Sequence, residues 1–355
     1  MPGGVSKVVK MSRTRDFRNC ILDSDVIIYD LMTNDFEEVD YVIKTLKTSK
    51  LEKQKTLIII SSVMTWVNTP PKLEVEGEDA GDEEAAVESD APESEAEEGE
   101  EEEAEEPAEE AEGEEGEDGE QAKPAKVKLF KESDYVNRVP HERFIPHKNL
   151  ETLALSAPKA QPKLKVHILC GGIRYGHGEG VFYDHFKNAW LQAPKELQVL
   201  GDGKNLIPTI HIRDLARTVR RIVDDDLSKS YIFCVDKTRK PTQKRLVEAV
   251  SKGVGTGKVK ECHPGEMPDS IFWKDFMMIN LMMRSSSIFK KRALPEGEEE
   301  AAEEDEAKRI FPWHCKKGII GNARMLNEEF NDARELKPVK IMVTGPPAVG
   351  KSFYA

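Results

Sequence analysis

The chain has 355 residues and a formal net charge of −14, from 66 acidic and 52 basic residues. No apolar run is long enough to cross a bilayer and the first residues lack the apolar core of a secretory signal, which excludes membrane-spanning and secreted classes. The five cysteines are scattered and form no C-x-x-C pair, a usage typical of a reducing, cytoplasmic compartment.

The negative charge is concentrated in two acidic runs. Residues 76–120 hold 26 acidic residues and residues 295–307 hold 8, and neither run contains a Lys or Arg. The rest of the chain has 52 basic against 32 acidic residues, a net charge of +20. Such a basic body suits an acidic partner, such as nucleic acid or an acidic protein tail, unless the runs simply solubilise and screen it. The runs are too rich in Glu to bury a core, so we expect both to be disordered insertions.

Strands and helices alternate on either side of the acidic runs. Apolar, β-branched stretches predict buried parallel strands, and apolar residues at helical spacing predict helices. Alternation of the two types predicts an α/β fold with a Rossmann-like parallel sheet. In chain order we expect a helix over 13–23, a strand over 25–29, a helix over 36–51, a strand over 57–60, a helix over 142–155, a strand over 165–169, a Gly-rich loop over 171–176, helices over 181–191 and 213–224, a strand over 230–235, helices over 243–252 and 322–336, and a strand over 341–343.

The last strand leads into the most specific motif of the chain. It matches G-x-x-x-x-G-K-[ST], in which a curled backbone points its N–H groups at phosphate oxygens. We expect Lys351 to reach the terminal phosphates of ATP as the catalytic residue of a complete kinase domain, and Ser352 to ligate Mg²⁺ arriving with the nucleotide. The predicted nucleotide-binding residues are Gly345, Pro346, Pro347, Ala348, Val349, Gly350, Lys351 and Ser352.

The body of the chain resembles a known enzyme family. The strand at 25–29, the Ile-Ile-Ser-Ser run ending at Ser62, Arg174-Tyr-Gly176, and the Gly-Asp-Gly to Asp-Leu-Ala block over 200–216 follow the order of extended short-chain dehydrogenases of the epimerase/dehydratase type. The resemblance covers residues 13–285 and implies a Rossmann-like sheet whose N-terminal strands are missing from this chain.

The join of such a domain to this phosphate loop resembles the cilia-associated adenylate kinases. In that family an epimerase-like region precedes a nucleoside monophosphate kinase domain, which converts ATP and AMP to two ADP. The resemblance implies a cytoplasmic protein of the ciliary or flagellar axoneme. It also implies that the epimerase-like domain docks on other axonemal proteins, with no nucleic acid or membrane partner. Few residues follow Ser352, so we expect this chain alone to be inactive.

The expected domain organisation follows from the two resemblances and the acidic runs. It comprises an epimerase-like first part at 1–74, an acidic insertion at 75–125, an epimerase-like second part at 126–294, an acidic insertion at 295–308, a connecting segment at 309–337, and the start of a phosphate-loop kinase domain at 338–355.

Departures from the dehydrogenase pattern argue against oxidoreductase chemistry. No Gly-rich turn follows a first strand, so we expect NAD(P) to bind weakly or not at all. Val63 stands where the family has its catalytic serine, and Phe144, four residues before Lys148, stands where it has its tyrosine. Without that phenol a general acid or base is missing. The alternative is an NAD(P)-dependent epimerase or reductase from an incomplete gene model.

Some polar residues remain that the motifs do not use. Tyr175, His177 and His211 are interpreted as shaping the sheet, and Asp214 as a capping carboxylate at a helix N-terminus. The histidines show no metal-ligand spacing, so no metal is expected beyond Mg²⁺ with the nucleotide. The Met-rich segment 273–283 is interpreted as packing against the sheet, with a partner-docking face as the alternative.

Overall fold

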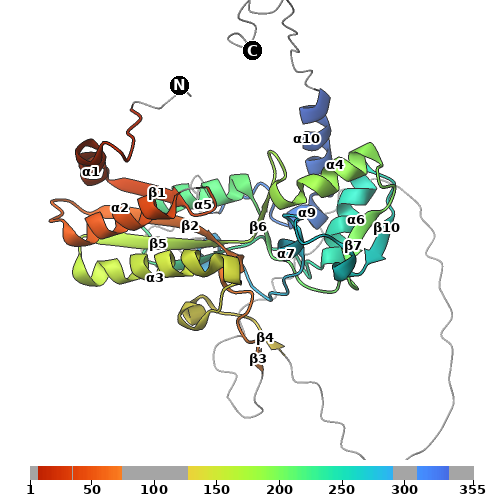
Figure 1. Ribbon diagram of the computed structural model, residues 1–355, viewed down its shortest axis with the longest axis horizontal. Coiled ribbons are helices and arrows are strands. Elements are labelled where there is room, and N and C mark those ends of the chain that lie inside the picture. Colours follow the sequence, from red (N-terminus) through yellow and green to blue (C-terminus); the bar gives the residue numbers. More distant parts are fainter. Residues whose placement is uncertain (1–6, 34, 74–126, 291–309, 336–355) are drawn as a thin grey trace, which may run out of the picture. The chain divides into compact units, whose positions relative to one another are not determined.

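A computed structural model of the protein describes residues 7–33, 35–73, 127–290 and 310–335 (Figure 1). Both acidic runs and the whole phosphate loop at 345–352 with its strand lie outside the described residues. Contacts divide the chain into one unit of residues 1–70 with 129–355, and a second of residues 71–128. Within the second unit, β3 (Lys72–Leu73) pairs antiparallel with β4 (Val127–Lys128).

A parallel sheet of four strands forms the centre of the first unit. Its strands run in the order β1 (Val26–Asp30), β2 (Lys55–Ser62), β5 (Leu164–Gly171) and β9 (Tyr231–Cys234). Strands that neighbour one another in chain order are typical of one half of a doubly wound sheet. The expected α/β fold with a Rossmann-like parallel sheet is therefore confirmed.

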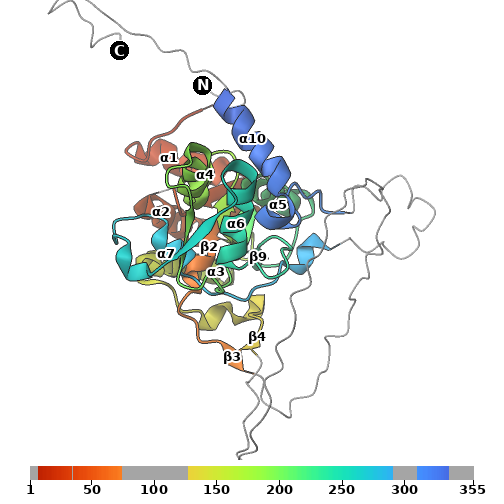
Figure 2. The same cartoon turned by 90° about the vertical axis from the view of Figure 1, so that its right-hand side faces the viewer.

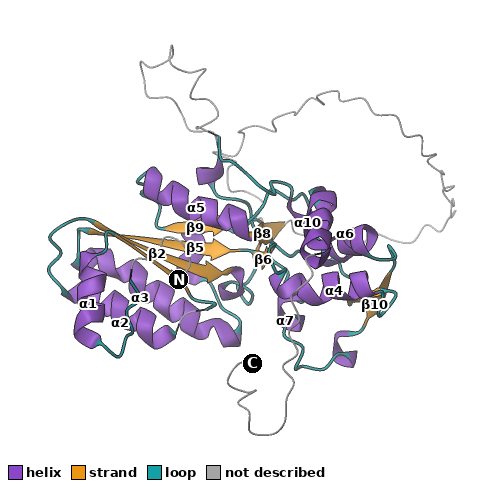
Figure 3. Ribbon diagram, turned by 90° about the horizontal axis from the view of Figure 1, so that it is seen from above, coloured by secondary structure: helices purple, strands orange, loops and turns teal. Residues whose placement is uncertain are grey.

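Helices cover both faces of this sheet (Figure 3). On one face lie α1 (Thr14–Asp23), α2 (Phe36–Thr48) and α3 (Ile145–Ala160), and on the other lies α5 (Ile212–Asp224). The sequence explains the placement of α2, because its apolar positions at helical spacing are completely buried. These positions are Val39, Val42, Ile43 and Leu46.

The remaining elements build a second group beyond the carboxyl ends of the strands. Helix α6 (Gln243–Val254) contacts α4 (Tyr183–Leu191), α9 (Gly318–Gly321) and α10 (Ala323–Glu335). Figures 2 and 3 show α10 beside α6. The short helix α7 (Lys274–Met277) belongs to the Met-rich segment, and two parallel strand pairs complete the group. These are β6 (Ile173–Tyr175) with β8 (Thr209–His211), and β7 (Leu197–Leu200) with β10 (Val259–Cys262).

Two details differ from the sequence-based expectations, and a third expectation is confirmed. The stretch expected as a Gly-rich loop contains β6, and the short strands β7, β8 and β10 were not predicted. Helix α3 begins three residues later than expected, because residues 142–144 form a 3-10 turn, and Pro146 occupies its first turn, where no N–H is needed. Most apolar residues of the Met-rich segment are buried, which confirms packing, although Met278 and Met282 are partly exposed.

Backbone hydrogen bonds connect the segments that lie before and after the long acidic insertion in the sequence. The amide of Asn68 donates to the carbonyl of Val139 at 3.0 Å, and that of His141 to the carbonyl of Met64 at 3.0 Å. The backbone that precedes residue 71 and the backbone that follows residue 128 are thus joined within the first unit. None of the described helices is both long and apolar enough to span a bilayer.

Candidate functional site

The positions that the sequence resemblance aligned with dehydrogenase catalytic residues lie where β2 ends and α3 begins. Val63 opens η1 (Val63–Thr65) directly after β2 and is fully buried. Phe144 precedes α3 and is buried, with its ring 5.9 Å from that of Phe276 and 4.5 Å from that of His147. Lys148, in the first turn of α3, is half-buried. A phenyl ring packed against other aromatic rings and an aliphatic side chain therefore occupy these two positions, where proton transfer would need hydroxyls.

Two other buried phenols do not substitute for the missing tyrosine. Burial raises the pKa of Tyr231 and that of Tyr175 well above the ordinary value for tyrosine. A general base of the dehydrogenase kind needs a phenol with a lowered pKa. Both side chains therefore stay neutral at physiological pH and act as hydrogen-bonding groups.

A buried polar network centres on Glu151 of α3, which is fully shielded from solvent. Its carboxylate lies 2.8 Å from Arg138 Nη2, and the hydroxyl of Tyr231 donates to it at 3.2 Å. The Ser61 hydroxyl also donates to it, and Trp66 Nε1 donates to the Tyr231 hydroxyl at 2.9 Å. Burial raises the pKa of Glu151, while Arg138 and the two hydroxyls oppose that change by stabilising the anion.

Internal contacts engage polar groups at the carboxyl ends of β1 and β2, the edge where doubly wound sheets bind ligands. Asp30 at the end of β1 forms a bidentate pair with Arg174 of β6, at 2.6 and 3.0 Å. Ser61 near the end of β2 is bonded to Glu151, and Ser62 accepts a bond from the amide of Met64 at 3.3 Å. Side chains that could otherwise orient a ligand here hold the fold together instead.

A second polar cluster gathers around His211 at the start of α5. Its ring lies 5.2 Å from that of Tyr175 and 4.5 Å from that of His314. The interpretation of Asp214 as a capping carboxylate is wrong, because its oxygens accept the amides of His314 at 2.6 Å and Cys315 at 2.8 Å. The cap of α5 is His211, whose Nδ1 accepts from the amide two residues on, at 3.1 Å.

Candidate metal ligands also meet in this cluster, since atoms of His211, His314 and Cys315 lie within 4.8 Å of one another. Two features oppose metal binding. The Nδ1 of His211 accepts a hydrogen bond, so the neutral ring carries its proton on Nε2. That nitrogen faces Gly176 so closely that an added Cβ there would lie 2.1 Å away. Arg213, 3.4 Å from His314 Nε2, adds positive charge, so the donor set does not suit a cation.

Two hollows in the described part of the chain were considered as candidate ligand sites. One, of about 390 Å³, is lined by three acidic and three basic side chains together with Gly203 and Thr242. Because Lys244 pairs with Glu261 at 3.3 Å and Lys204 with Asp202 at 3.5 Å, the charges largely compensate one another. No unpaired charge of one sign therefore marks this hollow as a catalytic centre.

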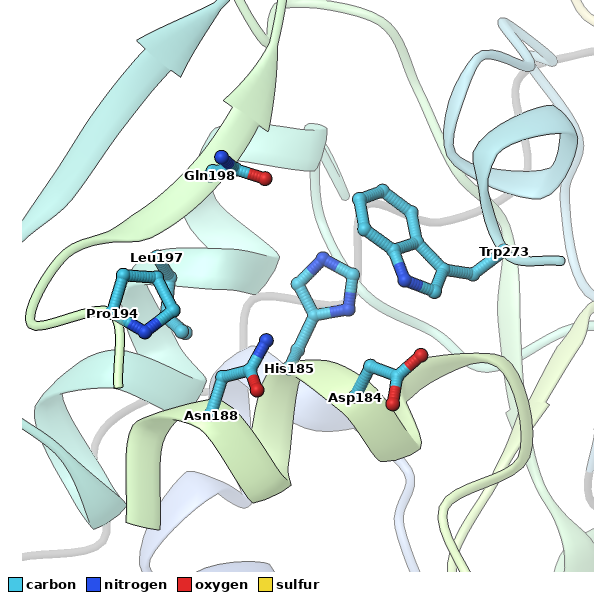
Figure 4. Close-up of a pocket in the computed structure, with 7 residues that line it drawn as sticks. All are labelled: Asp184, His185, Asn188, Pro194, Leu197, Gln198 and Trp273. Carbon is cyan, nitrogen blue, oxygen red and sulfur yellow. The ribbon is translucent and has the colours of Figure 1, made fainter. Parts of the chain in front are cut away.

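The other hollow is a cavity of about 20 Å³ beside His185, enough for one water molecule (Figure 4). The His185 ring lies next to the indole of Trp273, with centroids 4.6 Å apart. Neither ring nitrogen has a partner among the described residues, and burial lowers the pKa of His185 to about 4.

We expect the replacement His185→Leu to make the protein less sensitive to acid. In the unfolded chain His185 binds a proton below about pH 6.5, whereas in the folded protein it stays neutral down to about pH 4. The free energy of unfolding therefore falls as the pH falls, by about 2 kcal/mol between about pH 7 and about pH 5 from this group. Urea unfolding at both pH values should show that loss in the wild type and a smaller loss in the variant. The surface variant His263→Gln should behave as the wild type, and equal slopes in all three would contradict the prediction.

Sequence comparison relates the chain to curated adenylate kinases. No family model matches the chain. Adenylate kinase 7 of Mus musculus is 28% identical over 342 residues, which cover 93% of this chain and 44% of that protein. Adenylate kinase 7 of Macaca fascicularis is 31% identical over 214 residues, or 58% of this chain and 36% of that protein. The chain thus spans less than half the length of these relatives.

Structural comparison relates the fold to nucleotide-sugar enzymes. A dTDP-glucose 4,6-dehydratase of Bacillus anthracis, solved in complex with NAD, superposes with a TM-score of 0.52 at 12% identity, over 92% of this chain and 79% of that chain. A UDP-N-acetylglucosamine 4-epimerase of Bacillus cereus gives a TM-score of 0.51 at 8% identity, over 92% of this chain and 86% of that chain. At such identities the likeness concerns the fold alone.

Proposed function

We propose that this chain, which is similar to adenylate kinase 7 and has the fold of epimerases and dehydratases, is part of a ciliary adenylate kinase. The similarity to adenylate kinase 7 over 342 residues carries the proposal. The phosphate-loop motif at 345–352 supports it from the sequence. In a protein with the full length of these relatives, this loop is proposed to bind ATP and Mg²⁺ for phosphoryl transfer to AMP.

The epimerase-like unit is proposed to be a non-catalytic docking module that binds other axonemal proteins in the cytoplasm of the cilium. Val63 and Phe144 are buried at the two positions where the dehydrogenase pattern has hydroxyls. Asp30, Ser61 and Ser62 are bonded internally at the ligand-binding edge of the sheet. Packing side chains fill the positions where catalytic groups would lie. Such a domain can still act by binding other proteins at its surface.

The competing candidate is an NAD(P)-dependent epimerase or reductase, which the similarity to a dehydratase solved with NAD favours. Calorimetric titration of the 1–355 chain with NADH and NADPH distinguishes the two. We expect no binding, because polar groups at the carboxyl ends of β1 and β2 are already engaged. Binding with a Kd of about 1 μM, about −8 kcal/mol, would overturn the non-catalytic assignment in favour of the oxidoreductase.

A further inference from the structure

Two segments far apart in the chain bring basic side chains together beside α6. The loop between β9 and α6 contributes three of them, the first turn of α6 contributes one, and the segment that leads into α9 contributes two, which follow Cys315 directly. The amide of Lys237 donates to the carbonyl of Lys316 at 2.8 Å, which joins the segments. We call this set the basic cluster: Lys237, Arg239, Lys240, Arg245, Lys316 and Lys317.

The cluster is exposed and largely uncompensated. All six side chains are exposed, and for five of them, all except Lys237, no described carboxylate lies within ion-pair distance. The Arg245 guanidinium instead donates to the backbone carbonyls of Arg239 and Lys240, each at 2.8 Å. Unneutralised like charges repel one another, so an anion that binds to this surface reduces the repulsion and lowers the free energy.

From this surface we infer that the docking module binds a carboxylate-rich peptide segment of a partner protein at the basic cluster. The inference rests on the proposed docking function and specifies the chemistry of the partner. Charge complementarity carries it, because the chain outside its acidic runs has a net charge of +20.

The composition of the cluster favours a peptide over nucleic acid. Four of its six members are lysines, which act as point charges and impose no bidentate geometry on the anion. No aromatic residue lies within the two contributing stretches, 237–245 and 316–317, whereas binding of single strands relies on stacking against aromatic rings. The surface therefore favours a ligand with a high density of negative charge and offers no stacking site for nucleobases.

The test measures the fluorescence anisotropy of a labelled poly-glutamate peptide titrated with the 1–355 chain, with a poly-glutamine peptide of equal length as control. We expect binding of poly-glutamate alone, weakening as salt is added. The double variant Lys240→Glu/Lys316→Glu should weaken binding about tenfold, about 1.4 kcal/mol. The matched variant Lys53→Glu/Lys195→Glu, which changes the net charge equally at exposed sites elsewhere, should leave it within about twofold.

Several outcomes would overturn the inference. One is the absence of poly-glutamate binding at low salt, and another is an equal loss in both double variants. A third is a short DNA duplex that binds as tightly as the peptide, which would mark a general polyanion surface. A fourth is binding only after residues 296–306 are deleted, which would mean that the chain's own acidic run occupies the cluster. Each result is independent of whether the chain binds NADH.

Discussion

Replacing Arg138 by methionine should lower the free energy of unfolding by about 3–5 kcal/mol, because it leaves the Glu151 carboxylate buried without its cation. The pair is completely shielded from solvent, with an N–O distance of 2.8 Å. The hydroxyls of Ser61 and Tyr231 remain as donors but carry no charge. Urea unfolding monitored by circular dichroism measures the change, with the slope m compared to confirm that the folded state stays compact.

An exposed ion pair of the same chemistry supplies the control. Arg143 lies 3.0 Å from Asp275, with the side chains 60% and 37% exposed, so Arg143→Met should cost at most about 1 kcal/mol. The double variant Arg138→Met/Glu151→Leu should be more stable than Arg138→Met alone, because no charge is then left buried. Equal losses for Arg138→Met and Arg143→Met would show that the buried network does not stabilise the fold.

The pH dependence of Arg138→Met gives a second readout. Burial raises the pKa of Glu151, and removal of Arg138 takes away the main opposing charge. Above the pKa of the unfolded chain, the unfolded state releases a proton that the folded state tends to keep, so stability falls as the pH rises. The deficit of the variant should therefore be larger at about pH 8 than at about pH 5.

The sequence predicts the central sheet well because its strands are apolar on both faces. β2 and β5 are runs of eight residues with almost every side chain buried, a pattern typical of internal strands of a parallel sheet. The β7 strand was missed because four residues are too few to establish a period, and its Gln198 is exposed. Such short strands depend on partners distant in the chain, which local patterns do not encode.

The candidate site is only partly readable from the sequence. Resemblance to the dehydrogenases singled out Val63 and Phe144, and the structure places both in the interior. The pair of Glu151 and Arg138 was missed, because an acidic residue on a helix most often faces solvent and its partner comes from a preceding loop. Asp214 was misinterpreted for a similar reason, since its backbone partners lie about a hundred residues further along the chain.

Replacing Lys351 by alanine should abolish phosphoryl transfer in a protein that extends over the full length of the adenylate kinase relatives. Lys351 is the only cationic side chain within the G-x-x-x-x-G-K-[ST] stretch, and such a cation acts on charge that moves between phosphates during transfer. Removing one preorganised group of this kind costs at least about a hundredfold in kcat. A coupled assay of ADP formation from ATP and AMP measures the loss, and Lys340→Ala, which removes a lysine before the predicted strand, should keep wild-type activity.

The same substitution separates the two proposed functions. Docking is assigned to the epimerase-like unit, so Lys351→Ala should co-sediment with isolated axonemes as the wild type does, whether or not ATP is present. In the 1–355 chain the substitution should change nothing measurable, because a phosphate loop holds ATP only when the rest of its domain closes around the nucleotide. ATP hydrolysis by the 1–355 chain, or ATP binding that depends on Lys351, would contradict the view that this chain needs the remainder of the kinase to act. Full activity of the extended variant would exclude the loop from catalysis altogether.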